Sequence, residues 1–93
     1  MLSIIIPTKD EPMIQKFVSE VNRRLKQSHE IIVVDDSKVL PKIKGAKVFQ
    51  QKSKGLGNAA KEGFEYAKGD VGALMDADGS HRVEELVKML GYI

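Results

Sequence analysis

Two aspartates one residue apart, Asp76 and Asp78, are the side chains whose types and spacing point most directly to chemistry. They follow the short apolar run VGALM (71–75), whose composition and flanking glycines predict a buried strand. Both carboxylates then lie at the carboxyl end of a strand, where open parallel α/β sheets bind their ligands. Carboxylate oxygens suit Mg²⁺ or Mn²⁺ and leave coordination positions free for phosphate oxygens. The pattern predicts a metal site for a diphosphate, and an ordinary turn after a strand remains the plainer interpretation.

Three further apolar runs predict the other strands of a sheet. Residues 2–6 form an aliphatic run that Pro7 is expected to close, because proline cannot donate to a strand ladder. Residues 30–36 repeat this pattern and end on two aspartates. A weaker strand is expected at 46–49, after a loop without clear periodicity.

Apolar side chains at helical spacing predict the helices between these strands. One helix is expected from Pro12 to Leu25, and a second from Gly55 to Ala67, with small residues and Phe64 on its sheet-facing side. A short last helix is expected at 83–90. Strands that alternate with helices imply right-handed crossovers and a parallel sheet, so the expected fold class is α/β.

The carboxyl ends of parallel strands meet at one edge of a sheet, and three acidic segments are expected there. These segments are residues 8–11, the pair Asp35 and Asp36, and the pair Asp76 and Asp78. If these residues served only to form turns, three separate acidic turns would have to occur at the same edge by coincidence. Their convergence therefore favours a binding site.

Composition predicts a single small domain covering residues 1–93. The chain has 15 Lys and Arg against 13 Asp and Glu, a net charge of +2, which gives no indication of a nucleic-acid partner. It has no cysteine, so a metal site has to use oxygen or histidine ligands. No run approaches the roughly 20 apolar residues of a transmembrane segment, and the amino-terminal run is too short for a signal peptide. A cytoplasmic protein is the expectation.

Four sequence blocks resemble the family 2 glycosyltransferases, in particular their dolichyl-phosphate mannosyltransferase branch. The blocks are IIIPTKDE (4–11), EIIVVDDS (30–37), KGLGNA (54–59) and MDADGSH (75–81). The resemblance covers essentially the whole chain but only the nucleotide-binding, N-terminal half of the family's GT-A domain. It implies a Rossmann-like parallel sheet of about four strands in the order 3-2-1-4, with helices on both faces.

The resemblance also implies which residues bind a GDP- or UDP-sugar. The segment 7–11 matches the lining of the nucleoside pocket, although Lys9 stands where the family usually has an aromatic residue. Asp36 matches an aspartate that accepts a hydrogen bond from a base imino group, and Asp35 is expected to support the same loop. The implied nucleotide-binding residues are Pro7, Thr8, Lys9, Glu11, Asp35, Asp36, Lys54, Gly55 and Asp76.

Asp76 and Asp78 match the family's metal-binding Asp-x-Asp, which implies Mg²⁺ or Mn²⁺ as cofactor, with Asp78 as the catalytic residue that holds the ion. The implied reaction is inverting transfer of the sugar to an acceptor such as dolichyl phosphate. A phosphate acceptor is already an anion and needs little help from a general base.

A second functional class stays open. Family members continue with strands that bind the acceptor, so the alternative is a non-catalytic nucleotide-sugar-binding module or a truncated subunit. The apolar run 71–75 is expected at an uncovered edge of the sheet, and apolar residues follow near Leu90. We therefore expect a homo-oligomer, most simply a dimer.

Other motif matches are weaker. The aspartate pair 35–36 followed by LMD (74–76) also resembles a response-regulator receiver, but receivers begin with the Asp-Asp strand, whereas a strand and a helix precede it here. GLGNAA (55–60) fits a dinucleotide fingerprint but lies in the third strand-helix unit rather than the first. His81 is interpreted as a helix-start residue, since no second histidine lies at ligand spacing.

Overall fold

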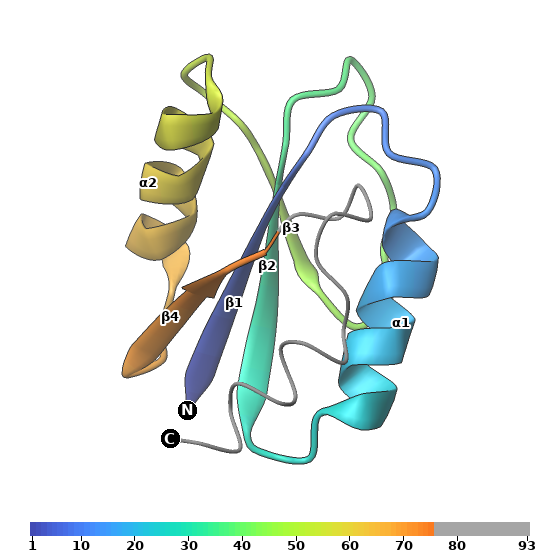
Figure 1. Ribbon diagram of the computed structural model, residues 1–93. Coiled ribbons are helices and arrows are strands. Elements are labelled where there is room, and N and C mark those ends of the chain that lie inside the picture. Colours follow the sequence, from blue (N-terminus) through green and yellow to red (C-terminus); the bar gives the residue numbers. More distant parts are fainter. Residues whose placement is uncertain (76–93) are drawn as a thin grey trace.

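The computed structural model describes residues 1–75, except for the side chain of Leu56. Its elements are β1 (Leu2–Thr8), α1 (Ile14–Arg24), β2 (His29–Asp35), β3 (Lys47–Gln50), α2 (Leu56–Tyr66) and β4 (Val71–Leu74). The strands pair in parallel in the order β3-β2-β1-β4 (Figure 1). This confirms the predicted α/β class and strand order. The helix predicted at 83–90 lies outside the described residues.

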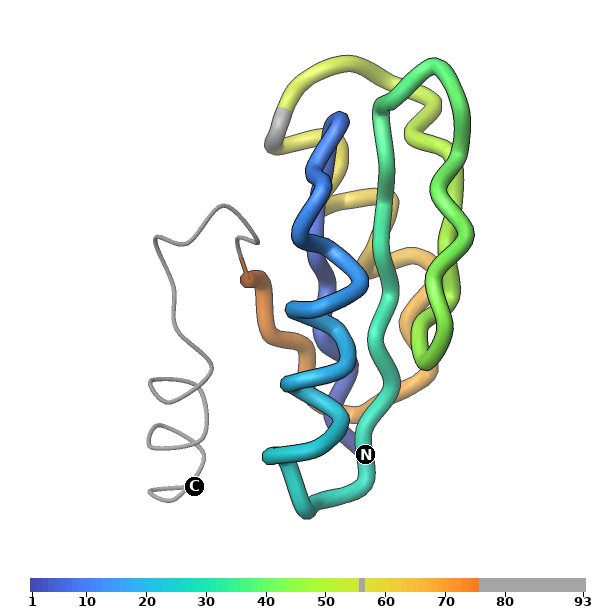
Figure 2. The backbone as a smooth tube through the Cα atoms, turned by 90° about the vertical axis from the view of Figure 1, so that its right-hand side faces the viewer, coloured from blue at the N-terminus to red at the C-terminus, as the bar shows by residue number. Residues whose placement is uncertain are grey.

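The two helices cover opposite faces of the sheet, as Figures 1 and 2 show. Successive side chains of a strand point to opposite faces, so Ile4 and Ile6 join the cluster that packs on α1, while Ile5 joins Ala59 of α2. Both central strands are therefore buried on two sides. This burial explains why the middle of each strand, residues 4–6 of β1 and 31–34 of β2, consists of consecutive aliphatic residues instead of alternating apolar and polar ones.

The weak third strand is confirmed, one residue later than predicted. Its Phe49 ring stacks on Tyr66 of α2, with the ring centroids 3.8 Å apart and the planes 4° from parallel. An aromatic pair of this kind adds about 0.5–1.5 kcal/mol beyond the burial of its area. This contact fixes β3 against α2 although β3 itself is short and only partly buried.

The prediction that Pro7 closes β1 is wrong, because the strand continues to Thr8 and Pro7 pairs with Val34. The N–H of Met75 donates to the carbonyl of Ile5, so the backbone groups of Ile5 point toward β4. Those of Pro7, two residues on, point the same way. Pairing with β4 ends at Ile5, so the missing N–H of Pro7 costs no ladder hydrogen bond.

The prediction that residues 71–75 form a buried strand is also wrong over most of its length. In the described chain β4 pairs with β1 alone, and Val71 and Leu74 are 51% and 47% exposed. The ring of Phe64 lies over Gly72, where an added Cβ would come within 2.2 Å of it, and is itself 46% exposed. Only Met75, at 4% exposure, reaches the core.

The close approach of α2 to the sheet depends on Gly63. A Cβ at this position would lie 2.2 Å from Cγ2 of Ile5. We therefore expect Gly63→Ala to lower the free energy of unfolding by about 1–3 kcal/mol despite the better helix propensity of alanine. Urea unfolding followed by circular dichroism measures this change.

Gly57 supplies the matched control because it lies in the same helix and an added Cβ there meets no atom within 4 Å. We expect Gly57→Ala to be neutral or to raise stability by up to about 1 kcal/mol. Equal stabilisation by both substitutions would show that α2 does not pack this tightly on β1.

Candidate functional site

A cleft of about 430 Å³ lies at the carboxyl edge of the sheet. Its lining comes from the loops after β1 and β2 and from the segment before α2. The lining residues are Lys9, Asp10, Asp36, Lys38, Val39 and Lys54. Two of the three acidic segments expected to converge at this edge contribute to the lining, through Asp10 and Asp36, and the third lies outside the described residues.

Three of the residues predicted to bind a nucleotide, Lys9, Asp36 and Lys54, line this cleft together. Asp10 also lines it and belongs to the segment 7–11 that was predicted to line the pocket, although it was not among the predicted nucleotide-binding residues. Lys38 and Val39 line the cleft as well and were not predicted. Lys38 stands two residues after the predicted Asp36, and this closeness in the sequence was the only signal for it. The three lysines outnumber the two aspartates of the lining, which favours an anionic ligand.

Asp35 lies beside Asp36 in the sequence but is 1% exposed and is not among the residues that line the cleft. Its carboxylate accepts hydrogen bonds from the hydroxyl of Thr8 at 2.6 Å and from the N–H of Ser37 at 2.8 Å. Both oxygens therefore already have donors within the protein. Direct contact of Thr8 or Asp35 with a nucleotide stays a prediction.

Asp10 lies in the loop after β1 and has a φ of +50°, in the left-handed region that few residues other than glycine adopt. Aspartate tolerates this conformation better than most residues. Its N–H donates to the hydroxyl oxygen of Ser37 at 2.6 Å, which joins the two loops that line the cleft. This bond compensates part of the backbone strain.

The segment before α2 is anchored on the helix that follows it. Gly55, the N-cap residue just before α2, has a φ of +101°, a conformation that favours glycine. The side-chain amide of Asn58 donates to the carbonyl of Lys54 at 2.7 Å. The carboxylate of Glu62 accepts the N–H groups of residues 52 and 53, and these bonds lower its pKa below the usual value. The helix thus holds Lys54 at the cleft.

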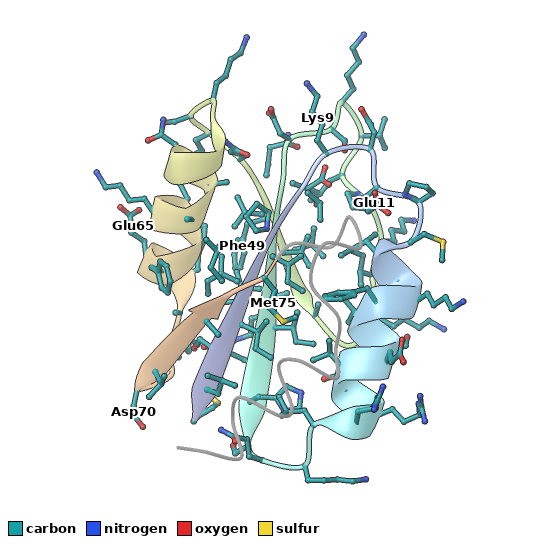
Figure 3. All side chains as sticks on the ribbon, viewed as in Figure 1. Lys9, Glu11, Phe49, Glu65, Asp70 and Met75 are labelled. Carbon is teal, nitrogen blue, oxygen red and sulfur yellow. The ribbon has the colours of Figure 1, made fainter. Side chains whose placement is uncertain are left out.

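The structure does not bring every predicted residue to the cleft. Pro7 lies within β1, and the carboxylate of Glu11 accepts the N–H of Met13 at 3.3 Å at the start of α1. Figure 3 shows Glu11 beside that helix and Lys9 farther along the edge of the sheet. Neither Pro7 nor Glu11 is among the residues that line the cleft.

The predicted metal ligands Asp76 and Asp78 lie outside the described residues. Met75, the last described residue, bonds through its N–H to Ile5, so β4 leads the chain toward the edge that carries the cleft. Residues 1–75 contain no group of three or more acidic or histidine side chains that could hold a metal ion. The carboxylates of Asp76 and Asp78 have the chemistry that suits a divalent ion, and their role as metal ligands stays a prediction.

The sequence model of glycosyl transferase family 2 matches residues 3–93. The chain belongs to this family. It is 35% identical over 101 residues to a dolichol-phosphate mannosyltransferase of Pyrococcus furiosus, in an alignment that covers 96% of this chain and 29% of that protein. This family 2 chain thus spans less than a third of the length of that relative. The resemblance stated from the four sequence blocks is confirmed.

Within residues 1–75 of this family 2 chain, no helix is long and apolar enough to cross a membrane. The cytoplasmic location and the homo-oligomer expected from the sequence stay predictions.

Proposed function

We propose that this chain forms the donor-binding part of a glycosyltransferase that binds a GDP- or UDP-sugar through Mg²⁺ or Mn²⁺. The acceptor we propose is a lipid phosphate such as dolichyl phosphate, with inversion at the transferred sugar. One observation carries the proposal: a family 2 sheet has a cleft at its carboxyl edge, lined by lysines from three separate loops. The name of the Pyrococcus relative supports the choice of acceptor.

Each group of side chains has a proposed task. Asp36 accepts a hydrogen bond from the base, and Val39 gives the base an apolar wall. The ammonium groups of Lys9, Lys38 and Lys54 attract the diphosphate. Asp76 and Asp78 would hold a divalent ion, which would supply positive charge to neutralise the leaving diphosphate.

The charges of the cleft predict that binding depends on the metal ion. Asp10 and Asp36 lie in the lining itself, and Asp76 and Asp78 follow β4 in the sequence, so a diphosphate meets carboxylates as well as lysines. A divalent ion converts this repulsion into attraction. We expect weak binding without the ion and much tighter binding with it.

Titration calorimetry of the chain with GDP and with UDP, in the presence and absence of Mn²⁺, tests the proposal. We expect Mn²⁺-dependent binding of at least one nucleotide and about tenfold weaker binding by Asp36→Asn, because a buried base donor loses its charged acceptor. Lys42→Ala is the control, since Lys42 is an exposed lysine of the same loop outside the cleft lining.

Failure of both nucleotides to bind in the presence of Mn²⁺ would overturn donor binding at this cleft. Turnover measured with a polyprenyl phosphate then separates a transferase from a donor-binding module. Binding without turnover would support the module.

A further inference from the structure

Two hydrogen bonds of the same kind join β1 to β2 at opposite ends of the sheet. The hydroxyl of Ser3 donates to a carboxylate oxygen of Glu30, and the hydroxyl of Thr8 donates to a carboxylate oxygen of Asp35, both at 2.6 Å. In each case the donor and the acceptor are register partners of the two strands, and both hydroxyl residues are buried. Only the Thr8–Asp35 bond lies at the end that carries the cleft.

At that end the bond belongs to a connected set that reaches both cleft loops. The second oxygen of Asp35 accepts the N–H of Ser37, and the Ser37 hydroxyl accepts the N–H of Asp10. The N–H of Asp36 donates to the carbonyl of Thr8 at 2.9 Å. The cleft residues Asp10 and Asp36 are thus held directly through their own backbone amides.

We propose that the Thr8–Asp35 pair is a positioning latch that fixes the two loops relative to each other before a ligand binds. Thr8 and Asp35 act by holding the loops that carry Lys9, Asp36 and Lys38, since the Thr8 hydroxyl and both carboxylate oxygens of Asp35 already have hydrogen-bond partners within the protein. The latch holds Asp10 in its left-handed conformation, which would relax if the loops separated. Loops fixed in advance bind more tightly because less ordering is needed on binding.

The first test needs no ligand. Amide hydrogen exchange is followed by NMR in Thr8→Val, which removes the hydroxyl and keeps the branched shape, and in Ser3→Ala, which removes the equivalent bond at the far end. We expect the amides of Asp10, Asp36 and Ser37 to exchange about tenfold faster in Thr8→Val, beyond any change in the core strands. In Ser3→Ala the three amides should change no more than the core. Equal behaviour of the two variants would overturn the latch.

Two further variants keep the test decisive if Thr8→Val does not fold. Thr8→Ser retains the hydroxyl and should restore slow exchange at all three amides. Ser37→Ala removes only the link to Asp10, and should speed exchange at that amide while the Thr8–Asp35 bond persists. Unchanged exchange at Asp10 in Ser37→Ala would contradict the proposed connection.

The second test rests on the proposed function. With Mn²⁺ and the nucleotide that the unmodified chain binds, we expect about tenfold weaker affinity for Thr8→Val, recovery in Thr8→Ser and no change in Ser3→Ala. A loss of affinity that Thr8→Ser does not restore would overturn the positioning role. If the unmodified chain binds neither nucleotide, the proposed function fails and the exchange measurement alone decides the latch.

Discussion

Replacing Asp78 by asparagine is expected to abolish Mn²⁺-dependent binding of GDP or UDP, lowering the affinity by at least about 100-fold. The substitution removes one carboxylate charge from a site where a hard divalent ion depends on charged oxygen ligands. Removing a residue that only hydrogen-bonds to a metal ligand already lowers metal affinity by about 10–100-fold, so removing a ligand itself should lower it at least as much. Titration calorimetry in the presence and absence of Mn²⁺ measures the effect.

Asp70→Asn is the matched control because it makes the same charge change just before β4, away from the cleft. The Asp70 side chain is 90% exposed and pairs with the amino terminus at 3.2 Å, and Figure 3 shows it at the start of the strand. This variant should bind the nucleotide as the unmodified chain does. Unchanged metal-dependent binding in Asp78→Asn would remove Asp78 from the proposed metal site.

Replacing Glu30 by glutamine is expected to lower the free energy of unfolding at pH 7 by about 3 kcal/mol. The pKa of Glu30 is lowered from 4.5 to about 2, chiefly by the hydrogen bond from Ser3. The N–H of Lys68 and the ammonium of Lys47 add to this effect, while burial opposes it. A shift of this size corresponds to roughly 3 kcal/mol, because the side chain is only 8% exposed and little screened.

The sign of this effect fixes the pH dependence. A carboxyl group with a lowered pKa in the folded chain stabilises it fully above the unfolded value of about 4.5. That stabilisation is lost as the pH falls toward 2. Urea unfolding at a series of pH values should show this loss in the unmodified chain and a flatter profile in Glu30→Gln.

Glu65→Gln provides the comparison for Glu30 because Glu65 is an exposed carboxylate on the outer side of α2 (Figure 3). Its replacement should change stability by less than about 0.5 kcal/mol at any of these pH values. Parallel pH profiles for the unmodified chain and Glu30→Gln would show that Glu30 does not anchor this end of the sheet.

The binding experiment on Asp78 and the stability experiment on Glu30 test opposite ends of the same sheet. At the amino end of the sheet, Glu30 of β2 accepts hydrogen bonds from Ser3 of β1, from Lys47 of β3 and from the N–H of Lys68 before β4. The cleft lies at the carboxyl end. We therefore expect Glu30→Gln to change stability with little effect on nucleotide affinity.

The sequence by itself determined the sheet, its strand order and the family. Consecutive aliphatic residues such as 4–6 and 31–34 are typical of strands that are covered on both faces, so these runs already implied helices on two sides of the sheet. The four sequence blocks were enough to predict the family. The ends of the strands were predicted less well. Proline was expected to end β1, but its missing N–H disrupts a strand only where a neighbouring strand offers an acceptor for that hydrogen bond, and in the described part of the chain none is paired beside Pro7 on that side.

Only the tertiary structure decided which polar residues face the cleft. Asp35 and Asp36 are chemically identical neighbours, yet one is buried against Thr8 and the other lines the cleft. The choice depends on the register of β1 and β2, which pairs residues 27 positions apart. Residue type determines what chemistry is available, whereas long-range pairing decides which side chains are used within the structure and which are left for a ligand.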